Sequence, residues 1–290
     1  MKKRISLLLP TRGRTKLVER FLQSVIAQST HPELIEIVVC VDDDDPESHG
    51  IASDKLDLKL VIVPRQSMGA YNSICLQHAT GEITIAVNDD IVIRTEGWDE
   101  KVRALDARYP DGIYLGYAND LFKGRKVSTF PILSRETCEA MAEPYPNIYK
   151  GAFIDVHLMD VFRRLEKRGY PRMAYAEDIV FEHIHYRTNP DILDSTYQER
   201  SRFGDDATFI ALAEARRLEA DRLLAHISGT IVHNGSVGSM LATEPTNFFG
   251  IIPLCFSKFL CDLDLPVVWR TYLFGYMVAR YYFDWFRKLA

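Results

Sequence analysis

The stretch of residues 81–98, GEITIAVNDDIVIRTEGW, constrains the fold more than any other part of the chain. Residues 83–87 form an apolar and β-branched run, which is typical of a central strand buried on both faces. Asn88, Asp89 and Asp90 then place polar groups at the carboxyl end of that strand, where open α/β sheets bind ligands and a carboxylate can hold a hard divalent cation. Side chains alternate along an extended chain, so Asp89 should face away from its two neighbours. A polar β-turn is the alternative explanation, because Asn and Asp favour turns.

Strands and helices alternate along the first part of the chain. Apolar runs at 5–9, 35–41 and 58–63 predict strands, and helical spacing appears at 17–28 and 69–79. This alternation predicts an α/β fold built on a mostly parallel, doubly wound sheet.

The later segments are expected to continue in the same way. A strand is predicted at 112–116, a helix at 156–168, and a long helix at 205–227. We expect residues 1–200 to form the main domain and residues 201–290 to form a helical extension.

Composition narrows the class of protein. The 290 residues are 47% hydrophobic, which is ample for a core, and the net charge of −5 without a long basic run argues against a nucleic-acid partner. The five cysteines are scattered and form no CxxC spacing, which favours a reducing compartment. The apolar run near the start is too short for a signal-peptide core, and no run is long enough for a membrane span. We therefore expect a cytoplasmic protein.

Four consecutive aspartates, 42–45, follow the strand predicted at 35–41. Their charges repel one another, so the run must be either solvated or engaged in binding. Its position at the carboxyl end of a second strand favours binding, because a carboxylate there can accept the imide N–H of a uracil or a ribose hydroxyl.

Three segments, ISLLLPTRGR, IEIVVCVDDDDPES and ATGEITIAVNDD, resemble the nucleotide-binding half of a GT-A glycosyltransferase and are most similar to glycosyltransferase family 2. The similarity is close over residues 1–100 and looser to about Arg187. The resemblance implies a metal-dependent, inverting glycosyltransferase that moves a sugar from a nucleotide-sugar donor to a hydroxyl acceptor. A binding or structural module that keeps the fold without catalysis is the alternative. A sugar nucleotidyltransferase is disfavoured, because the loop at 10–14 has one glycine.

The resemblance also assigns residues to the donor site. It implies that Thr11 and Asp43 lie against the base, that Asp89 lies near the ribose, and that Asp90 holds Mn²⁺ or Mg²⁺ on the diphosphate. The family triplet is usually Asp-x-Asp or Asp-Asp-Asp. This chain has Asn88 in place of the first acid and keeps the last acid as Asp90. The other residues expected in the donor site are Arg12, Asn72 and Asn88.

One acid near the start of the helix at 156–168 is the candidate general base. In the enzymes that this chain resembles, an acid at the start of the helix after the acceptor-side segment takes the acceptor's proton. Asp155 matches that place, and Asp160 is the fallback. A purely structural role as the helix N-cap is the alternative for Asp155.

Two histidines follow in the segment 176–185. If this segment is a strand, His183 and His185 project to the same face. The alternative is that both histidines simply lie on the surface and bind nothing. In many enzymes that the chain resembles, a histidine near this place is the second protein ligand of the metal, and imidazole suits Mn²⁺-like ions. We expect His183 to bind the metal. His185 is expected to orient His183, to share the metal or to contact phosphate.

Aromatic residues concentrate in the segment 245–290, where several charged residues interrupt them. The segment should therefore lie on a membrane surface or pack on protein rather than span a bilayer. A position on the inner face of the membrane would suit a lipid-linked or polysaccharide acceptor. Core packing and a homo-oligomer interface are equally compatible with the pattern.

Overall fold

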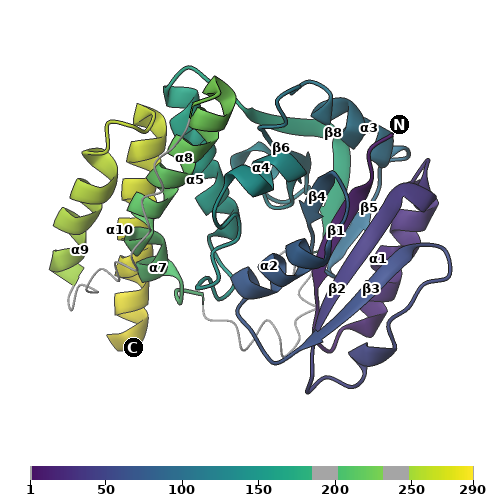
Figure 1. Ribbon diagram of the computed structural model, residues 1–290. Coiled ribbons are helices and arrows are strands. Elements are labelled where there is room, and N and C mark those ends of the chain that lie inside the picture. The colour runs from purple at the N-terminus through teal and green to yellow at the C-terminus, as the bar shows by residue number, and fades with distance from the viewer. Residues whose placement is uncertain (1, 185–201, 231–247, 290) are drawn as a thin grey trace.

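The computed structural model describes residues 2–184, 202–230 and 248–289, and an eight-stranded mixed sheet lies at its centre (Figure 1). The strands are β1 (Ile5–Pro10), β2 (Ile35–Asp42), β3 (Asp57–Val63), β4 (Ile83–Ala86), β5 (Ile91–Ile93), β6 (Leu115–Asn119), β7 (Pro131–Ser134) and β8 (Met173–His183). Their order across the sheet is β3-β2-β1-β4-β7-β6-β8-β5. Strands β1 to β4 pair in parallel, as do β6 and β8, whereas β7 is antiparallel to both neighbours and β5 is antiparallel to β8. The predicted α/β fold is confirmed.

Helices cover both faces of the sheet and create two cores. The helices on one face are α1 (Thr15–Gln28) and α3 (Trp98–Asp106), and those on the other are α2 (Met68–His78), α4 (Arg135–Ala140) and α5 (Ile154–Lys167). Along β1 the side chains alternate, so Leu7 and Leu9 join Phe21 of α1 in one core while Leu8 joins Phe162 of α5 in the other. Burial on both faces explains the continuous apolar runs of these strands.

The parallel strands bring three chain segments to one rim of the sheet. β1 lies between β2 and β4, with Pro10 in register with Cys40 and Leu8 with Ala86. The backbone N–H of Val87 continues this ladder by donating to the Leu8 carbonyl at 2.9 Å. The loops that follow β1, β2 and β4 therefore begin side by side, as expected for a ligand site in an open α/β sheet.

Two predicted elements have different bounds in the structure. The strand predicted at 112–116 is β6 at Leu115–Asn119, because Gly112 adopts a left-handed turn (φ +72°) just before it. The helix predicted at 205–227 is divided into α7 (Asp206–Ala211) and α8 (Ala213–Ser228). At the break, Arg216 Nη1 donates to the Phe209 carbonyl at 2.6 Å, so this carbonyl is satisfied without a continuous helix.

The last helices extend the core on the α5 side of the sheet. They are α8, then α9 (Phe248–Cys255), a π-helical turn at Phe256–Leu260, and α10 (Val267–Leu289). Figure 1 shows α9 and α10 beyond α5 and α8, at the end of the molecule away from β3. Buried residues of α8 and α10 belong to the same core as Leu8 of β1. None of the helices in the described part of the chain is long and apolar enough to cross a membrane.

A buried ion-pair network joins α5, α8 and α10 around Asp160. The carboxylate accepts hydrogen bonds from Arg216 Nε at 2.7 Å, from Trp269 Nε1 at 2.8 Å and from Arg164 at 3.3 Å. Burial alone would raise the pKa of Asp160, but the two guanidinium groups and the indole N–H lower it below its usual value. Asp160 has no solvent exposure, so an acceptor cannot reach it. The fallback assignment of Asp160 as general base is therefore abandoned.

Removing the Asp160 carboxylate should strongly destabilise the protein. Asp160→Ala leaves Arg216 as a buried charge without its carboxylate, and breaking such a pair costs about 3–5 kcal/mol. The matched control is Asp178→Ala, which removes an exposed ion pair with Lys101 and should cost less than about 1 kcal/mol. Urea unfolding monitored by tryptophan fluorescence measures both. Similar, small losses in the two variants would contradict a stabilising role for the network.

Candidate active site at the carboxyl rim of the sheet

The loop after β1 binds the acid that follows β4. Thr11 Oγ1 donates to Asp89 Oδ2 at 2.7 Å, and Arg14 Nη1 lies 3.0 Å from Asp89 Oδ1. Burial raises the pKa of Asp89 to about 6, although Arg14 acts in the opposite direction, and the neighbouring charge of Asp90 raises it further. A cation bound at this rim would favour the ionised form of Asp89. Thr11 and Asp89, two of the residues predicted for the donor site, are therefore in direct contact.

The run of four aspartates is held apart by separate partners. Asp42 is buried and accepts from Arg12 Nη1 at 2.6 Å and from the Tyr71 hydroxyl. Asp45 is buried and accepts from the Gly13 N–H at 2.6 Å. The exposed Asp44 pairs with the same guanidinium as Asp42. The repulsion within the run is thus relieved by internal contacts rather than by solvent alone.

Asp43 differs from the other three acids of the run. Its side chain is exposed, and its backbone N–H donates to the Val63 carbonyl at 2.8 Å. Within the described residues the Asp43 carboxylate makes no hydrogen bond or ion pair. It is therefore the acid of the run that is available to a ligand at the rim.

Asp90 and His183 meet although they are 93 residues apart in the chain. The antiparallel pairing of β5 with β8 places Ile91 opposite His183, and the Ile184 N–H donates to the Asp90 carbonyl at 2.9 Å. His183 Nε2 and Asp90 Oδ2 lie 3.2 Å apart, with both side chains nearly buried. The edge-on ring of Phe130, 5.4 Å away, helps to fix the imidazole.

This pair has the chemistry of a small metal site. One imidazole nitrogen and one carboxylate suit Mn²⁺, and Mg²⁺ often takes one or two carboxylates together with substrate phosphates. Among the described residues no cluster of three or more His, Cys, Asp or Glu side chains could hold a metal. Within the part of the chain that the structure describes, Asp90 and His183 are thus the two residues that could hold the ion together. His185 lies outside the described residues.

Two asparagines predicted for the donor site have less direct support. Asn72 is buried on α2, next to Tyr71, whose hydroxyl bonds Asp42 of the rim. Asn88 is half-buried between β4 and Asp89. Their positions are compatible with the rim, but within residues 2–184 no hydrogen bond or ion pair links the side chain of either one to another predicted residue.

Asp155 lies in the first turn of α5, but it is not the N-cap. The cap is Phe153, which has a left-handed backbone (φ +68°), so the alternative explanation of Asp155 as the helix N-cap is wrong. Asp155 is half-buried, and its carboxylate accepts from the N–H of the next residue, Val156, at 2.8 Å. Among the described residues, no hydrogen bond or ion pair joins Asp155 to Thr11, Asp43, Asp89 or Asp90, so its role as base is a proposal from its position on α5.

The turn that leads to Asp155 is bound by a distant acid. The Asp205 carboxylate accepts from three successive N–H groups, those of residues 150–152, at 2.7 to 3.0 Å. Phe153 stacks on Phe209 of α7 at 4.7 Å, and the Arg280 guanidinium of α10 lies 4.9 Å from its ring centre. A non-glycine residue with positive φ is strained, so these contacts hold the turn in place.

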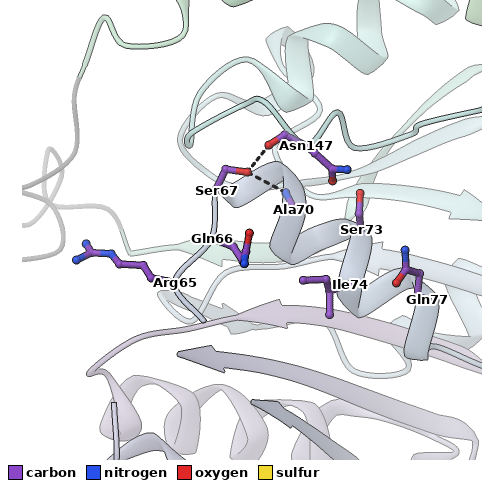
Figure 2. Close-up of a pocket in the computed structure, with 8 residues that line it drawn as sticks. All are labelled: Arg65, Gln66, Ser67, Ala70, Ser73, Ile74, Gln77 and Asn147. Atoms are coloured by element: carbon purple, nitrogen blue, oxygen red, sulfur yellow. Dashed lines mark hydrogen bonds between the residues drawn. The ribbon is translucent and has the colours of Figure 1, made fainter. Parts of the chain in front are cut away.

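A cleft of about 500 Å³ runs along α2, and its lining residue Gln66 donates its N–H to the hydroxyl of Tyr71, the residue that bonds Asp42 of the rim. Figure 2 shows its lining, in which Ser67 Oγ accepts from the Ala70 N–H at 3.1 Å and donates to the Asn147 carbonyl. None of the predicted site residues lines it. The cleft residues are Arg65, Gln66, Ser67, Ala70, Ser73, Ile74, Gln77 and Asn147.

Sequence reasoning missed two residues of this site. Arg14 belongs to the TRGR turn, and a basic side chain just after a strand that faces acidic strand ends was an available signal. Asp205 gave no such signal, because its three partners lie more than 50 residues earlier in the chain.

Comparisons with solved structures support the fold. The mannosyltransferase PcManGT from Pyrobaculum calidifontis, solved with GDP-Man and Mn²⁺, is 16% identical, with a TM-score of 0.50 over 97% of this chain and 86% of that one. S. aureus TarS 1-349 is 15% identical, with a TM-score of 0.54 over 96% of this chain and 89% of that one. A complex of TarS 1-349 with UDP-GlcNAc has the same identity and coverage and a TM-score of 0.50. At these identities the likeness shows a shared fold, in agreement with the GT-A fold implied by the resemblance.

Sequence comparison identifies the family. No curated protein sequence matches the chain significantly. The family model described as Glycosyl transferase family 2 matches residues 6–151, which is just over half of the chain and contains β1 through β7 together with Thr11, Asp43, Asp89 and Asp90. The chain therefore belongs to glycosyl transferase family 2 and is a glycosyltransferase.

Proposed function

We propose that this glycosyltransferase uses Mn²⁺ or Mg²⁺ and moves a sugar, with inversion, from a nucleotide-sugar donor to a glycan hydroxyl. The observation that carries the proposal is the nearly buried pair of Asp90 and His183, which converge at the carboxyl rim next to Asp89. The mannosyltransferase and TarS, which share the fold, were solved with GDP-Man and Mn²⁺ and with UDP-GlcNAc. Family membership and the intact pair favour catalysis over a binding module, despite Asn88 at the first position of the triplet.

Asp90 and His183 would hold the cation at the donor diphosphate. When bound, the ion neutralises the negative charge that develops on the departing diphosphate. His183 ends β8 and Asp90 immediately precedes the neighbouring strand β5, and both side chains are shielded from solvent, so their positions are fixed before a donor arrives. Preorganised ligands of this kind need little rearrangement during the reaction.

The other rim residues would bind the nucleoside. The exposed Asp43 carboxylate can accept a hydrogen bond from a base N–H or a ribose hydroxyl. Arg12 would act indirectly, because its guanidinium holds Asp42 and Asp44 on either side of Asp43. Asn72 and Asn88 offer amide groups to the same rim.

Asp155 would act as the general base. An inverting transfer is a single displacement, in which the acceptor oxygen attacks the anomeric carbon while a carboxylate takes the hydroxyl proton. Asp155 is half-buried, and its carboxylate accepts from the Val156 N–H at 2.8 Å, which holds it in the first turn of α5, the place of the general base in the enzymes that the chain resembles. The buried Asp160 cannot take this role.

The metal assignment predicts that Asp90→Ala abolishes metal-dependent activity. The experiment measures release of nucleoside diphosphate from UDP-, GDP- and CMP-type donors while Mn²⁺ is titrated, and isothermal calorimetry follows nucleotide binding with and without Mn²⁺. Asp43→Ala is the matched control, since it removes another rim carboxylate and should raise the donor KM while the response to Mn²⁺ stays normal. Activity of Asp90→Ala without added metal, at the level of the unchanged protein, would refute the assignment.

The base assignment predicts that Asp155→Asn keeps donor binding but loses most transfer. The amide keeps the shape of the side chain but cannot accept the proton, and a general base contributes about 10²- to 10⁴-fold. Steady-state kinetics with a donor and an acceptor that the unchanged protein uses measure this loss. Glu166→Gln, on the exposed side of the same helix, should be nearly silent. If Asp155→Asn lowers kcat only a few-fold, another group takes the proton.

A third prediction tests whether the turn before Asp155 matters for its role. Asp205→Ala removes the acceptor of three N–H groups and should lower kcat substantially, because misplacement of a catalytic group by about 1 Å can cost 10²-fold. The donor KM should stay unchanged, since the rim does not contact this turn. Asp205→Asn retains one carbonyl oxygen and should recover part of kcat. Equal losses in kcat and donor affinity would instead indicate general misfolding.

A further inference from the structure

The solvent face of α10 carries a long uncharged stripe. Exposed residues recur at alternating steps of four and three along this helix, which is the heptad spacing of a helix that packs against another helix. The stripe spans 19 residues, or about 28 Å of helix. Val268 is 80% exposed at one end, and Phe283, beside the stripe, is 62% exposed. We call this stripe the α10 seam; it comprises Val268, Tyr272, Gly275, Ala279, Tyr282 and Phe286.

The charged side chains that the structure describes on α10 lie off the seam and bind groups of the same molecule. Arg280 pairs with Asp206 at 2.6 Å, Arg287 pairs with Asp284 at 2.8 Å, and Arg270 donates to a backbone carbonyl. The opposite side of the helix packs into the core through Trp269, Leu273 and Met277. A surface helix normally turns its charged side to water, so an uncharged outer face indicates that something covers it.

The shape of the seam favours another helix over a lipid surface. A helix that lies in a membrane interface has a polar face rich in Lys and Arg, and the net charge of −5 does not favour an anionic surface. The α10 seam is narrow and interrupted by Gly275 and Ala279, and a Cβ placed on Gly275 would meet no atom within 4 Å. Small residues at the middle of a seam allow close approach of two helix axes.

The seam is also complementary to itself. In an antiparallel pair of α10 helices centred at residue 277, Gly275 faces Ala279, Tyr272 faces Tyr282 and Val268 faces Phe286 of the second copy. Small residues then meet at the centre, and large apolar residues meet at both ends. A two-fold interface requires the same patch on both subunits, and this stripe meets that requirement. With aromatic side chains of about 150–250 Å² each, the exposed parts of the seam and of the flanking Phe283 and Trp285 offer on the order of 600 Å² per copy, which is somewhat less than one side of a standard interface.

We propose that the protein forms a two-fold homodimer in which the α10 seam packs antiparallel against the same seam of a second copy. The interface is separate from the carboxyl rim, so it is independent of the donor site. It accounts for both the heptad spacing and the missing charge on this face.

Analytical ultracentrifugation of the full chain over a concentration series tests the proposal. We expect a dimer for the unchanged protein and a monomer for Ala279→Glu and for Tyr272→Glu, each of which buries a charge at the seam. The dissociation constant should rise roughly 30-fold or more, as for a central interface residue. Arg217→Glu on the exposed side of α8 is the matched control and should remain dimeric. Circular dichroism checks that each variant is folded.

Cross-linking gives a readout that does not depend on a destabilising variant. In a Cys261→Ser background, which removes the exposed native thiol, Ala279→Cys should be joined to a second copy by a short bis-maleimide, whereas Arg217→Cys should not. A monomer that floats with vesicles of phosphatidylcholine and phosphatidylglycerol would overturn the proposal in favour of lipid contact. A monomer that does not float, or a dimer that persists in both glutamate variants, would also overturn it.

Discussion

Carboxylates buried at the rim of a sheet must be compensated, and this requirement shapes the site more than any other constraint. Asp42, Asp45 and Asp89 are each less than one-tenth exposed. Residues of a single short loop compensate all three, through the Arg12 guanidinium, the Gly13 N–H, and Thr11 with Arg14. A buried charge without such partners would be strongly unfavourable. The loop after β1 therefore fixes the ends of β2 and β4. Within the described part of the chain, its side chains make no hydrogen bond to the exposed Asp43 or to Asp90, which pairs with His183.

The turn that leads to Asp155 is held in place by residues from a later part of the chain. The turn at residues 150–153 has a strained backbone, and its N–H groups bind Asp205 while its aromatic ring lies between α7 and α10. Arg280 of α10 links this turn to α7, since its guanidinium covers the Phe153 ring and pairs with Asp206. The helices at 202–289 thus do more than enlarge the core. They determine where α5 begins, and with it where Asp155 lies.

The sequence predicted those features that depend on local pattern. Buried strands and their polar ends follow from apolar periodicity, because parallel strands place their carboxyl ends together. The pairing of Asp90 with His183 is expected from the family resemblance, and the antiparallel pairing of β5 with β8 brings the two side chains together. The capping residue of α5 and the burial of Asp160 depend on backbone strain or on partners more than 50 residues away. The break between α7 and α8 is local, since Arg216 binds the Phe209 carbonyl there. Asp160 shows the difficulty clearly: an acid on an amphipathic helix looks the same in sequence whether it meets a substrate or two buried arginines.

The two sides of α10 connect these observations. Its inner side reaches the turn before Asp155 through Arg280, and its outer side carries the uncharged seam. A helix whose outer face is covered frays less than one exposed to water, because partly exposed apolar segments open most easily. Contact along the seam would therefore steady the helix that presents Arg280 to Phe153. Coupling of this kind needs no contact between the interface and the donor site, since the rigid helix itself joins them.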